Sequence, residues 1–358
     1  MEGFKLSCNN CNQTPEIPTG LKKIIIDTTH DFLLRKFYNL INKKINHIQY
    51  NEQEDFIAIE EDFTKFILEV SKLKNLFTDL ELENINITII NQNLNLSSIK
   101  NRKSLYYFLN LWDAQDLKWI LDNKSIVMDF QPIIECTTKN IFGYELLAKG
   151  INKDGSILPP KTMFDKAKNT QMLFLLDKTC RIKALEFAKN KNITTKIFIN
   201  YNPASIYNPE FCLLDTIHKA TELNFDFSNI VFEVVESEKH VNLKHLKNIF
   251  SIYRHRGFQV ALDDIGSGYS SLNMIAELKP EYIKIDKTII KDIHKDNTKR
   301  AIIHTLVDLT KEINAFLIAE GVETEEEFAI IKELGVHLSQ GYLFGKPSSE
   351  PLLTLQST

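Results

Sequence analysis

The sequence predicts an α/β protein in which a closed β/α barrel follows a small α/β or α+β domain. At 358 residues the chain is about twice as long as an average domain of roughly 150 residues. From about Ser125 onward, short β-branched or aromatic runs alternate with longer amphipathic stretches, which is typical of strand–helix units. Seven of the short runs carry a carboxylate, carboxamide or ammonium side chain at the end or within two residues of it. Strand ends converge on one rim of a barrel, so this pattern favours a barrel with a single shared site.

We expect each of the seven runs to form a strand. They are Tyr144–Leu147, Ile197–Asn200, Ile230–Glu233, Val260–Asp264, Tyr282–Asp286, Phe316–Glu320 and Leu338–Gln340. Helical spacing of apolar residues predicts the intervening helices at Phe174–Ala188, Leu243–Tyr253, Arg300–Ile313 and Glu325–Leu334. Thr324 is the expected N-cap of the last helix, because three glutamates follow it. The alternative is an open doubly wound sheet, which would spread the seven ends over a wider edge.

Residues 1–121 are expected to form the smaller domain, with a regulatory or sensory role, and residues 124–358 the barrel. Strands of the smaller domain are predicted at Lys22–Ile26, Phe56–Ile59 and Ile85–Ile90. Its helices are predicted at His30–Ile45, Phe63–Leu76 and Ser104–Leu121. A turn at Asp122–Lys124 is expected to lead into the barrel.

Composition excludes several classes of function. The formal net charge of −4 provides no general attraction for polyanions, so we expect no nucleic-acid polymer as partner. No apolar run approaches the roughly 18 residues of a membrane-spanning helix, so no membrane insertion is expected. The N-terminus lacks the features of a secretory signal, and five cysteines, an odd number, do not form a disulfide framework. The cytoplasm is therefore the expected compartment.

Cys8 and Cys11 have the spacing of half a zinc site. Two further ligands would be needed for Zn²⁺, and His30, His47 or a second copy of the chain could supply them. A redox pair and two free thiols near the terminus are the other interpretations. The sequence leaves these three alternatives open.

The polar residues of the runs suggest a metal site. Five acids would meet on the rim, together with the amide oxygen of Asn200: they are Glu145, Glu233, Asp263, Asp264 and Glu320. Clustered carboxylates either take up protons or bind cations, and a set of oxygen ligands without Cys or His selects hard ions such as Mg²⁺ or Mn²⁺. Lys284 and Asp286 lie two residues apart on one strand, so an ammonium group would enter the same site.

Asp263 and Asp264 are adjacent, and adjacent side chains of a regular strand point to opposite faces. Both can face the site only where the strand is interrupted, and Gly266 and Gly268 immediately afterwards allow this. We therefore expect the strand to break at this pair.

Eight motifs in the second part of the chain occur in a specific order. They are DFQPII from Asp129, GYELLAK from Gly143, FIN from Phe198, FEVVE from Phe232, DDIGSGYSSL from Asp263, IKID from Ile283, AEGVET from Ala319 and QGYLFGKP from Gln340. Over residues 125 to 348 the chain resembles the EAL-domain cyclic di-GMP phosphodiesterases. The resemblance implies a modified TIM-type (β/α) barrel, a homodimer, and hydrolysis of one phosphodiester bond of cyclic di-GMP to linear pGpG with two Mg²⁺ or Mn²⁺ ions.

The resemblance also implies roles for individual residues. One ion would be held by Glu145, Asn200, Glu233 and Asp263, and a second by Asp263, Asp264 and Glu320. Lys284 would orient the attacking water, Gln340 would support the water network, and Glu323 and Asp286 would act from outside the ligand set. Glu236 would support the loop from Gly266 to Ser271. The nucleotide groove would be lined by Gln131, Leu147, Lys149 and Pro347.

Three positions depart from the family pattern without removing a metal ligand. Lys149 replaces the common arginine and loses its bidentate phosphate geometry. Val235 replaces a frequent threonine, and the segment Pro160–Lys168 lacks the usual Ala-Glu ending. The alternatives to a hydrolase are a catalytically weak or silent cyclic di-GMP receptor that signals through a partner, and a scaffold that only dimerises.

Overall fold

The computed structural model describes residues 12–51, 53–90, 100–235, 243–266 and 271–354. The chain forms two compact units, one of residues 1–123 with 152–175 and the other of residues 124–151 with 176–358. No helix in the described ranges is long and apolar enough to cross a membrane.

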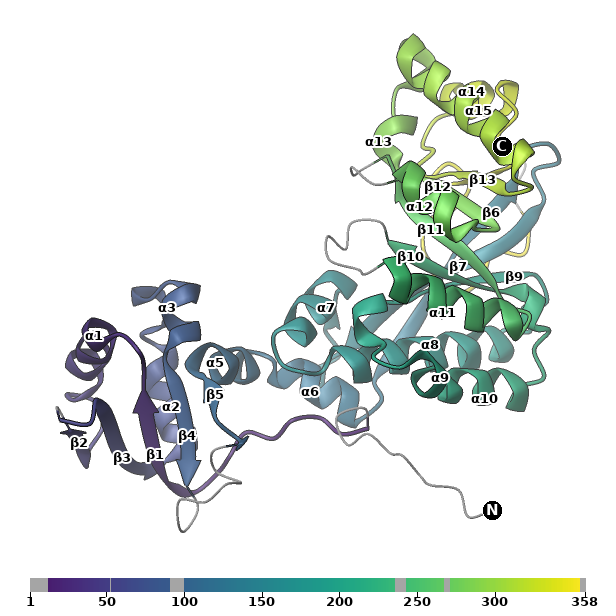
Figure 1. Cartoon of the computed structure of the whole chain (residues 1–358). Coiled ribbons are helices and arrows are strands. Elements are labelled where there is room, and N and C mark those ends of the chain that lie inside the picture. The colour runs from purple at the N-terminus through teal and green to yellow at the C-terminus, as the bar shows by residue number, and fades with distance from the viewer. Residues whose placement is uncertain (1–11, 52, 91–99, 236–242, 267–270, 355–358) are drawn as a thin grey trace. The chain divides into compact units, whose positions relative to one another are not determined.

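The first unit contains a five-stranded antiparallel sheet in the order β2-β3-β1-β4-β5, with helices packed beside it (Figure 1). The strands are β1 (Leu21–Asp27), β2 (Ile48–Asn51), β3 (Phe56–Asp62), β4 (Asn86–Ile90) and β5 (Lys103–Ser104). The helices are α1 (Asp31–Ile41), α2 (Phe63–Ser71), α3 (Asp79–Asn84), α5 (Leu105–Asp113), α6 (Gln115–Asp122) and α7 (Pro160–Lys168), and the unit also contains the short strand β8 (Ile157–Leu158). Alternate residues of the central strands point into one core with the apolar sides of α1 and α2.

Local signals set several of these boundaries. Asp62 caps α2, and Thr78 and Glu81 form a capping box at the start of α3. The helix predicted at Ser104–Leu121 is instead two helices, because Ala114 leaves the helical conformation at φ −103° and ψ 20°. The helix predicted at Phe63–Leu76 ends at Ser71, and a 3₁₀ turn follows at Lys74–Leu76. The short elements β2 and α3 were not predicted from the sequence.

The second unit is a closed barrel of eight strands, which confirms the predicted fold (Figure 1). The strands are β6 (Ile126–Glu135), β7 (Ile141–Ile151), β9 (Lys196–Asn200), β10 (Ile230–Val235), β11 (Gln259–Ile265), β12 (Tyr282–Ile285), β13 (Phe316–Ala319) and β14 (Leu338–Gln340). β6 runs antiparallel to both of its neighbours, β7 and β14, and the other neighbouring pairs are parallel. The open-sheet alternative is wrong, because the pairing of β6 with β7 closes the ring.

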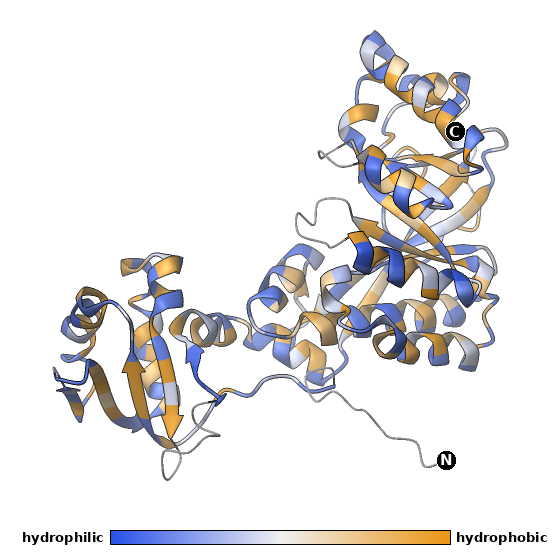
Figure 2. Ribbon diagram, in the orientation of Figure 1, coloured by the Kyte–Doolittle hydropathy of each residue, from blue (hydrophilic) through white to orange (hydrophobic). Residues whose placement is uncertain are grey.

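Helices follow most strands and lie on the outside of the barrel (Figure 1). They are α8 (Leu173–Asn190), α9 (Pro209–Cys212), α10 (Leu214–Glu222), α11 (Leu243–His255), α12 (Ser271–Leu278), α13 (Lys287–Ile290), α14 (Asn297–Glu312) and α15 (Glu325–Glu333). Figure 2 shows strands that are mostly apolar and helices that carry both polar and apolar residues, as expected for a buried sheet covered by amphipathic helices. Thr324 caps α15 as predicted, in a capping box with Glu327.

One end of the barrel interior is filled by a compact apolar layer. Every strand except β7 contributes one fully buried side chain to it: Ile133, Phe198, Val231, Ala261, Tyr282, Ile318 and Leu338. Successive residues of a strand point to opposite faces, so the residue two positions away along each strand also points inward. This layer therefore fixes which residues enter the site at the carboxyl ends of the parallel strands.

Candidate active site

Most of the candidate ligands, all except Glu145 and Asp264, lie two positions from a residue of the apolar layer. Asn200 follows Phe198 on β9, Glu233 follows Val231 on β10, and the same spacing places the remaining inward residues, which are Gln131, Asp263, Lys284, Glu320 and Gln340. The period of two along a strand is therefore the physical reason why these side chains converge.

Glu145 reaches the same interior from the middle of a strand. The sequence analysis placed it at a strand end, which is wrong, because β7 continues to Ile151. β6 pairs with β7 along this whole length, with Gln131 opposite Glu145 in the register. The antiparallel partner thus extends β7 beyond the rim, and Glu145 is held by sheet pairing with β6 on one side and β9 on the other.

Asp263 and Asp264 are brought together by an irregularity in β11. The strand continues to Ile265 instead of breaking, but its pairing with β12 shifts register between Leu262 and Ile265. Asp264 has a φ of +57°, in the left-handed region, and its backbone N–H donates to Oδ1 of Asp263 at 2.9 Å. The expected interruption is therefore present as a bulge.

The Lys284 ammonium group lies at the centre of the carboxylates. Its Nζ is 2.7 Å from Oε1 of Glu320 and 3.0 Å from Oε1 of Glu233. Oδ1 of Asp263 and Oε2 of Glu145 are slightly farther, at 3.4 Å and 3.5 Å. The lysine side chain is only 1% exposed, so one positive charge is shared among four acids, of which three are buried and Glu320 is half-buried.

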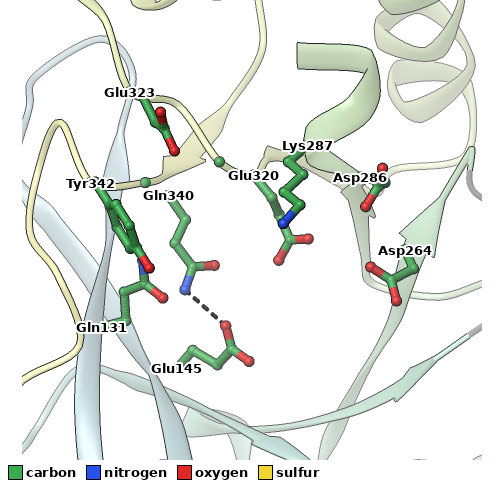
Figure 3. A pocket seen from close by; sticks show the side chains of 11 residues that line it. Gln131, Glu145, Asp264, Asp286, Lys287, Glu320, Glu323, Gln340 and Tyr342 are labelled. Atoms are coloured by element: carbon green, nitrogen blue, oxygen red, sulfur yellow. Dashed lines mark hydrogen bonds between the residues drawn. The ribbon is translucent and has the colours of Figure 1, made fainter. Parts of the chain in front are cut away.

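Two carboxamides fix the orientation of Glu145. The side-chain N–H of Asn200 donates to Oε1 of Glu145, and that of Gln340 donates to Oε2, each at 2.8 Å. With these bonds made, the amide oxygen of Asn200 points away from Glu145 and is free to act as a ligand. Figure 3 shows the bond between Gln340 and Glu145 across the floor of the site.

The pKa values of the acids shift in opposite directions, because burial raises all of them and the neighbours of Glu145 outweigh it at that residue. Desolvation raises the pKa of Glu233 well above its usual value, that of Glu320 to about 8 and that of Asp264 to about 6, and it also raises the pKa of Asp263. Burial alone would raise the pKa of Glu145 too, but Lys284 and the two carboxamides lower it. Burial opposes the charge of Lys284, and its four acidic neighbours nevertheless raise its pKa well above normal.

The residues present fit a site for divalent cations. Carboxylate oxygens of Asp263, Asp264 and Glu320 lie within 4.8 Å of one another. Both oxygens of Glu233 are buried, and apart from the ion pair of Oε1 with Lys284 neither has a polar partner among the described residues. If all five acids are ionised, Lys284 leaves four negative charges uncompensated, which is the charge that two divalent cations would balance.

A cavity of about 400 Å³ opens above these groups (Figure 3). Its lining includes the predicted residues Gln131, Glu145, Asp264, Asp286, Glu320, Glu323 and Gln340. It also includes four residues to which the sequence analysis gave no role, namely Lys287, Gly321, Gly341 and Tyr342. The three last-named lie inside the motifs beginning at Ala319 and Gln340, so those motifs contained the signal, whereas Lys287 follows IKID directly.

The other predicted residues lie outside this lining. Leu147 and Lys149 follow Glu145 on the same face of β7, and Pro347 is half-buried beyond Tyr342. Asp286 also caps α13 by accepting the backbone N–H of Thr288. Glu236, Cys8 and Cys11 fall outside the described residues, as does most of the loop from Gly266 to Ser271.

Fold and site together define a β/α-barrel protein with an acidic, lysine-centred cavity at the carboxyl ends of its strands. The family model described as EAL domain matches residues 114–347, and the chain belongs to this family.

Named relatives fall in the same family. The chain is similar to "Cyclic di-GMP phosphodiesterase PdeR" of Escherichia coli (strain K12), with 28% identity over 244 residues that cover 67% of this chain and 36% of the relative. It is also similar to "Probable cyclic di-GMP phosphodiesterase PdeG" of the same organism, with 28% identity over 253 residues, 68% of this chain and 48% of the relative. The chain thus spans less than half the length of either relative.

Among solved structures, the chain is similar to a standalone versatile EAL protein from Vibrio cholerae O395 in its c-di-GMP-bound form. The identity is 38% and the TM-score 0.58, over 64% of this chain and 95% of the other. The similarity covers nearly all of that protein and about two thirds of this one.

Proposed function

We propose that this chain hydrolyses cyclic di-GMP to linear pGpG and so lowers the level of this second messenger. The observation that carries the proposal is the cluster of five acids, two carboxamides and one buried lysine, of which Glu145, Asp264, Glu320 and Gln340 line a single cavity. The relatives support the choice of substrate, because PdeR is named a cyclic di-GMP phosphodiesterase and the Vibrio cholerae structure contains c-di-GMP.

Two Mg²⁺ or Mn²⁺ ions would be held by the acidic residues. Glu145, Asn200, Glu233 and Asp263 would hold one, and Asp263, Asp264 and Glu320 the other. When bound, such ions activate water and neutralise the charge that develops on the phosphodiester. The fit is supported by the short separations among the last three acids and by the unsatisfied oxygens of Glu233.

The protein's own residues would hold the reacting water and the substrate. Lys284 donates N–H bonds toward the centre of the acids and would orient the attacking water. Gln340 fixes Glu145 and would support the same water network. Asp286 and Glu323 line the cavity outside the ligand set and would position it. The nucleotide would be bound by Gln131, Leu147, Lys149 and Pro347.

Residues 1–121 would form a regulatory or sensory module, and the barrel, residues 124–358, would act as a homodimer in the cytoplasm. Glu236 would support the loop after β11 in such a dimer. Cys8 and Cys11 would contribute as a zinc site, a redox pair or free thiols, and metal analysis of the purified protein distinguishes the first from the others.

The test is turnover of cyclic di-GMP by the purified full chain with Mn²⁺, followed by separation of pGpG. We expect Glu145→Ala to lose activity by at least about 100-fold, because its carboxylate meets both carboxamides and the lysine. Glu312→Ala, which removes an exposed acid at the end of α14, is the matched control and should retain full activity. Unchanged turnover in Glu145→Ala refutes the site, and tight binding without turnover in the wild type supports a receptor instead.

A further inference from the structure

Asp129 lies beside the predicted phosphate-binding residue, and the sequence analysis assigned it no role. β6 and β7 pair with Gln131 opposite Glu145, Asp129 opposite Leu147, and Val127 opposite Lys149. Residues directly opposite each other on antiparallel strands share a face of the sheet. Asp129 and Lys149 therefore lie on the same face of the two-stranded ribbon formed by β6 and β7, the face that also carries Gln131 and Glu145 at the cavity.

The two side chains form an ion pair across the diagonal of this register. Oδ2 of Asp129 contacts Nζ of Lys149. The aspartate side chain is 5% exposed and the lysine side chain 30%, so the acid is enclosed while the ammonium retains an open side. Within the described part of the chain, Lys149 is the one basic group that compensates Asp129.

This geometry leaves the ribbon face nearly neutral where a cation is expected. A buried carboxylate without its counter-ion is destabilising, so the ion pair of Asp129 with Lys149 persists when a ligand binds. An ammonium has three donors and can contact a carboxylate and a phosphate together, but the two anions then repel each other across it. An arginine could have offered each anion a separate pair of N–H groups, which lysine lacks.

We propose that Asp129 sets the affinity of the site for its phosphodiester ligand by partly neutralising Lys149. The proposal rests on the proposed function, because it assumes that the phosphate approaches Lys149. Asp129 is an affinity-setting residue and takes no part in the reaction itself. Its effect is a weaker, faster-released complex, which suits turnover at high ligand concentration better than sensing at low concentration.

The consequence is a gain of affinity on removing one acid. Asparagine has nearly the shape of aspartate and keeps an acceptor for Lys149, but it removes the competing charge. In the full chain with Mn²⁺, Asp129→Asn should lower KM for cyclic di-GMP by about five-fold with kcat changed less than about two-fold. Lys149→Ala should raise KM instead. Asp308→Asn removes an exposed acid on α14 and is the control for net charge, with KM unchanged.

Binding and salt dependence separate this charge effect from a structural one. With Ca²⁺ in place of Mn²⁺ and cyclic di-GMP as the titrant, Asp129→Asn should bind about five-fold more tightly and lose affinity more steeply with added salt, because its lysine charge is no longer compensated. A KM that rises in Asp129→Asn would show that the acid orients Lys149, and an unmoved KM would show that the pair is inert. Either result overturns the inference while wild-type turnover leaves the proposed function standing, and absence of binding and turnover in every variant overturns both.

Discussion

Nζ of Lys284 lies 2.7 Å from Oε1 of the half-buried Glu320 and, at the same time, within 3.5 Å of the buried carboxylates of Glu145, Glu233 and Asp263. This one ammonium group is the common partner of acids from β7, β10 and β11 and of the residue after β13. The centre of the barrel mouth is therefore held together by a single positive charge that is outnumbered by its partners. The relationship has consequences for stability, for cation binding and for pH dependence.

Removal of the lysine charge should destabilise the metal-free protein strongly. Lys284→Met keeps the length of the side chain but leaves the acids without compensation, and we expect a loss of about 3–5 kcal/mol in unfolding free energy. Mn²⁺ should recover part of this loss, because it supplies positive charge at the same place. Thermal and denaturant unfolding with and without Mn²⁺ measure both effects. Lys311→Met, at an exposed lysine of α14, should change neither, and equal stability of the two variants would contradict the explanation.

Neutralisation of Glu233 should stabilise the metal-free protein, in contrast to removal of the Lys284 charge. The Glu233 side chain is fully buried, and burial raises its pKa well above the usual value although Lys284 lies 3.0 Å from Oε1. Glu233→Gln removes a desolvated charge, so the metal-free protein should gain about 1–3 kcal/mol while activity and the stabilisation by Mn²⁺ both fall. The two melting curves, with Mn²⁺ and with a chelator, should converge in this variant. A lower melting temperature in chelator would show that the charge itself stabilises the fold.

The raised pKa values predict a specific pH dependence of the metal-free protein. Burial raises the pKa of Glu320 to about 8 and that of Asp264 to about 6, above the ordinary values of 4.5 and 3.8. Between about pH 4 and pH 8 the folded state therefore binds more protons than the unfolded state. The free energy of unfolding decreases as the pH rises through this range. Affinity for Mn²⁺ should increase over the upper part of this range, because protons compete with the cation.

Unfolding in chelator and calorimetric titration with Mn²⁺, each at pH 6, 7 and 8, test this prediction. Glu320→Gln should flatten both profiles, because it removes a carboxyl group whose pKa is raised to about 8. Profiles that keep their slope in this variant would assign the proton to another acid of the cluster.

Gly341 is expected to be intolerant of even a methyl group. A Cβ at this position would overlap backbone atoms of Val322, which cannot move independently because its N–H donates to Gln340 and its carbonyl accepts from Leu343, both at 3.1 Å. Gly341→Ala should therefore displace the Glu320–Glu323 segment and reduce activity at least about ten-fold, with a loss of stability of about 1–3 kcal/mol. Activity and unfolding are measured together.

Gly155→Ala is the matched control for that experiment. It has a positive φ of 83° but open space around the added carbon. It should show the modest cost of the left-handed backbone alone, about 1 kcal/mol, and retain its activity. Equal activity losses in the two alanine variants would remove the overlap with Val322 as the cause.

The sequence was sufficient to predict the barrel because local signals repeat along it. Each of the seven runs lies within a strand or extends one residue past its end, since the period of two and the flanking helices agree along the barrel. The reversed strand β6 could not be predicted from its own residues. Its direction and partners depend on pairing with β7 and β14, at distant positions in the chain, and those pairings leave no local pattern.

In the site, too, local features could be predicted from the sequence and features that depend on strand pairing could not. Residue types and spacing predicted which side chains converge, because a strand fixes its inward face. The position of Glu145 in mid-strand and the pairing of Lys149 with Asp129 were not predicted, since both follow from the register of two strands. In the smaller unit, β2 and α3 are too short for periodicity to be read, and the break at Ala114 has no side-chain signal.

The extension of β7 past Glu145 divides the site into a rigid half and an adjustable half. Glu145, Glu233 and Lys284 lie on strands that are paired on both sides, so they cannot shift unless hydrogen bonds between the barrel strands break. Asp264 and Glu320 are carried by a bulge and by the turn after β13. Under the proposed function, a regulatory signal would therefore act on Asp264 and Glu320 more easily than on the three residues held in paired strands.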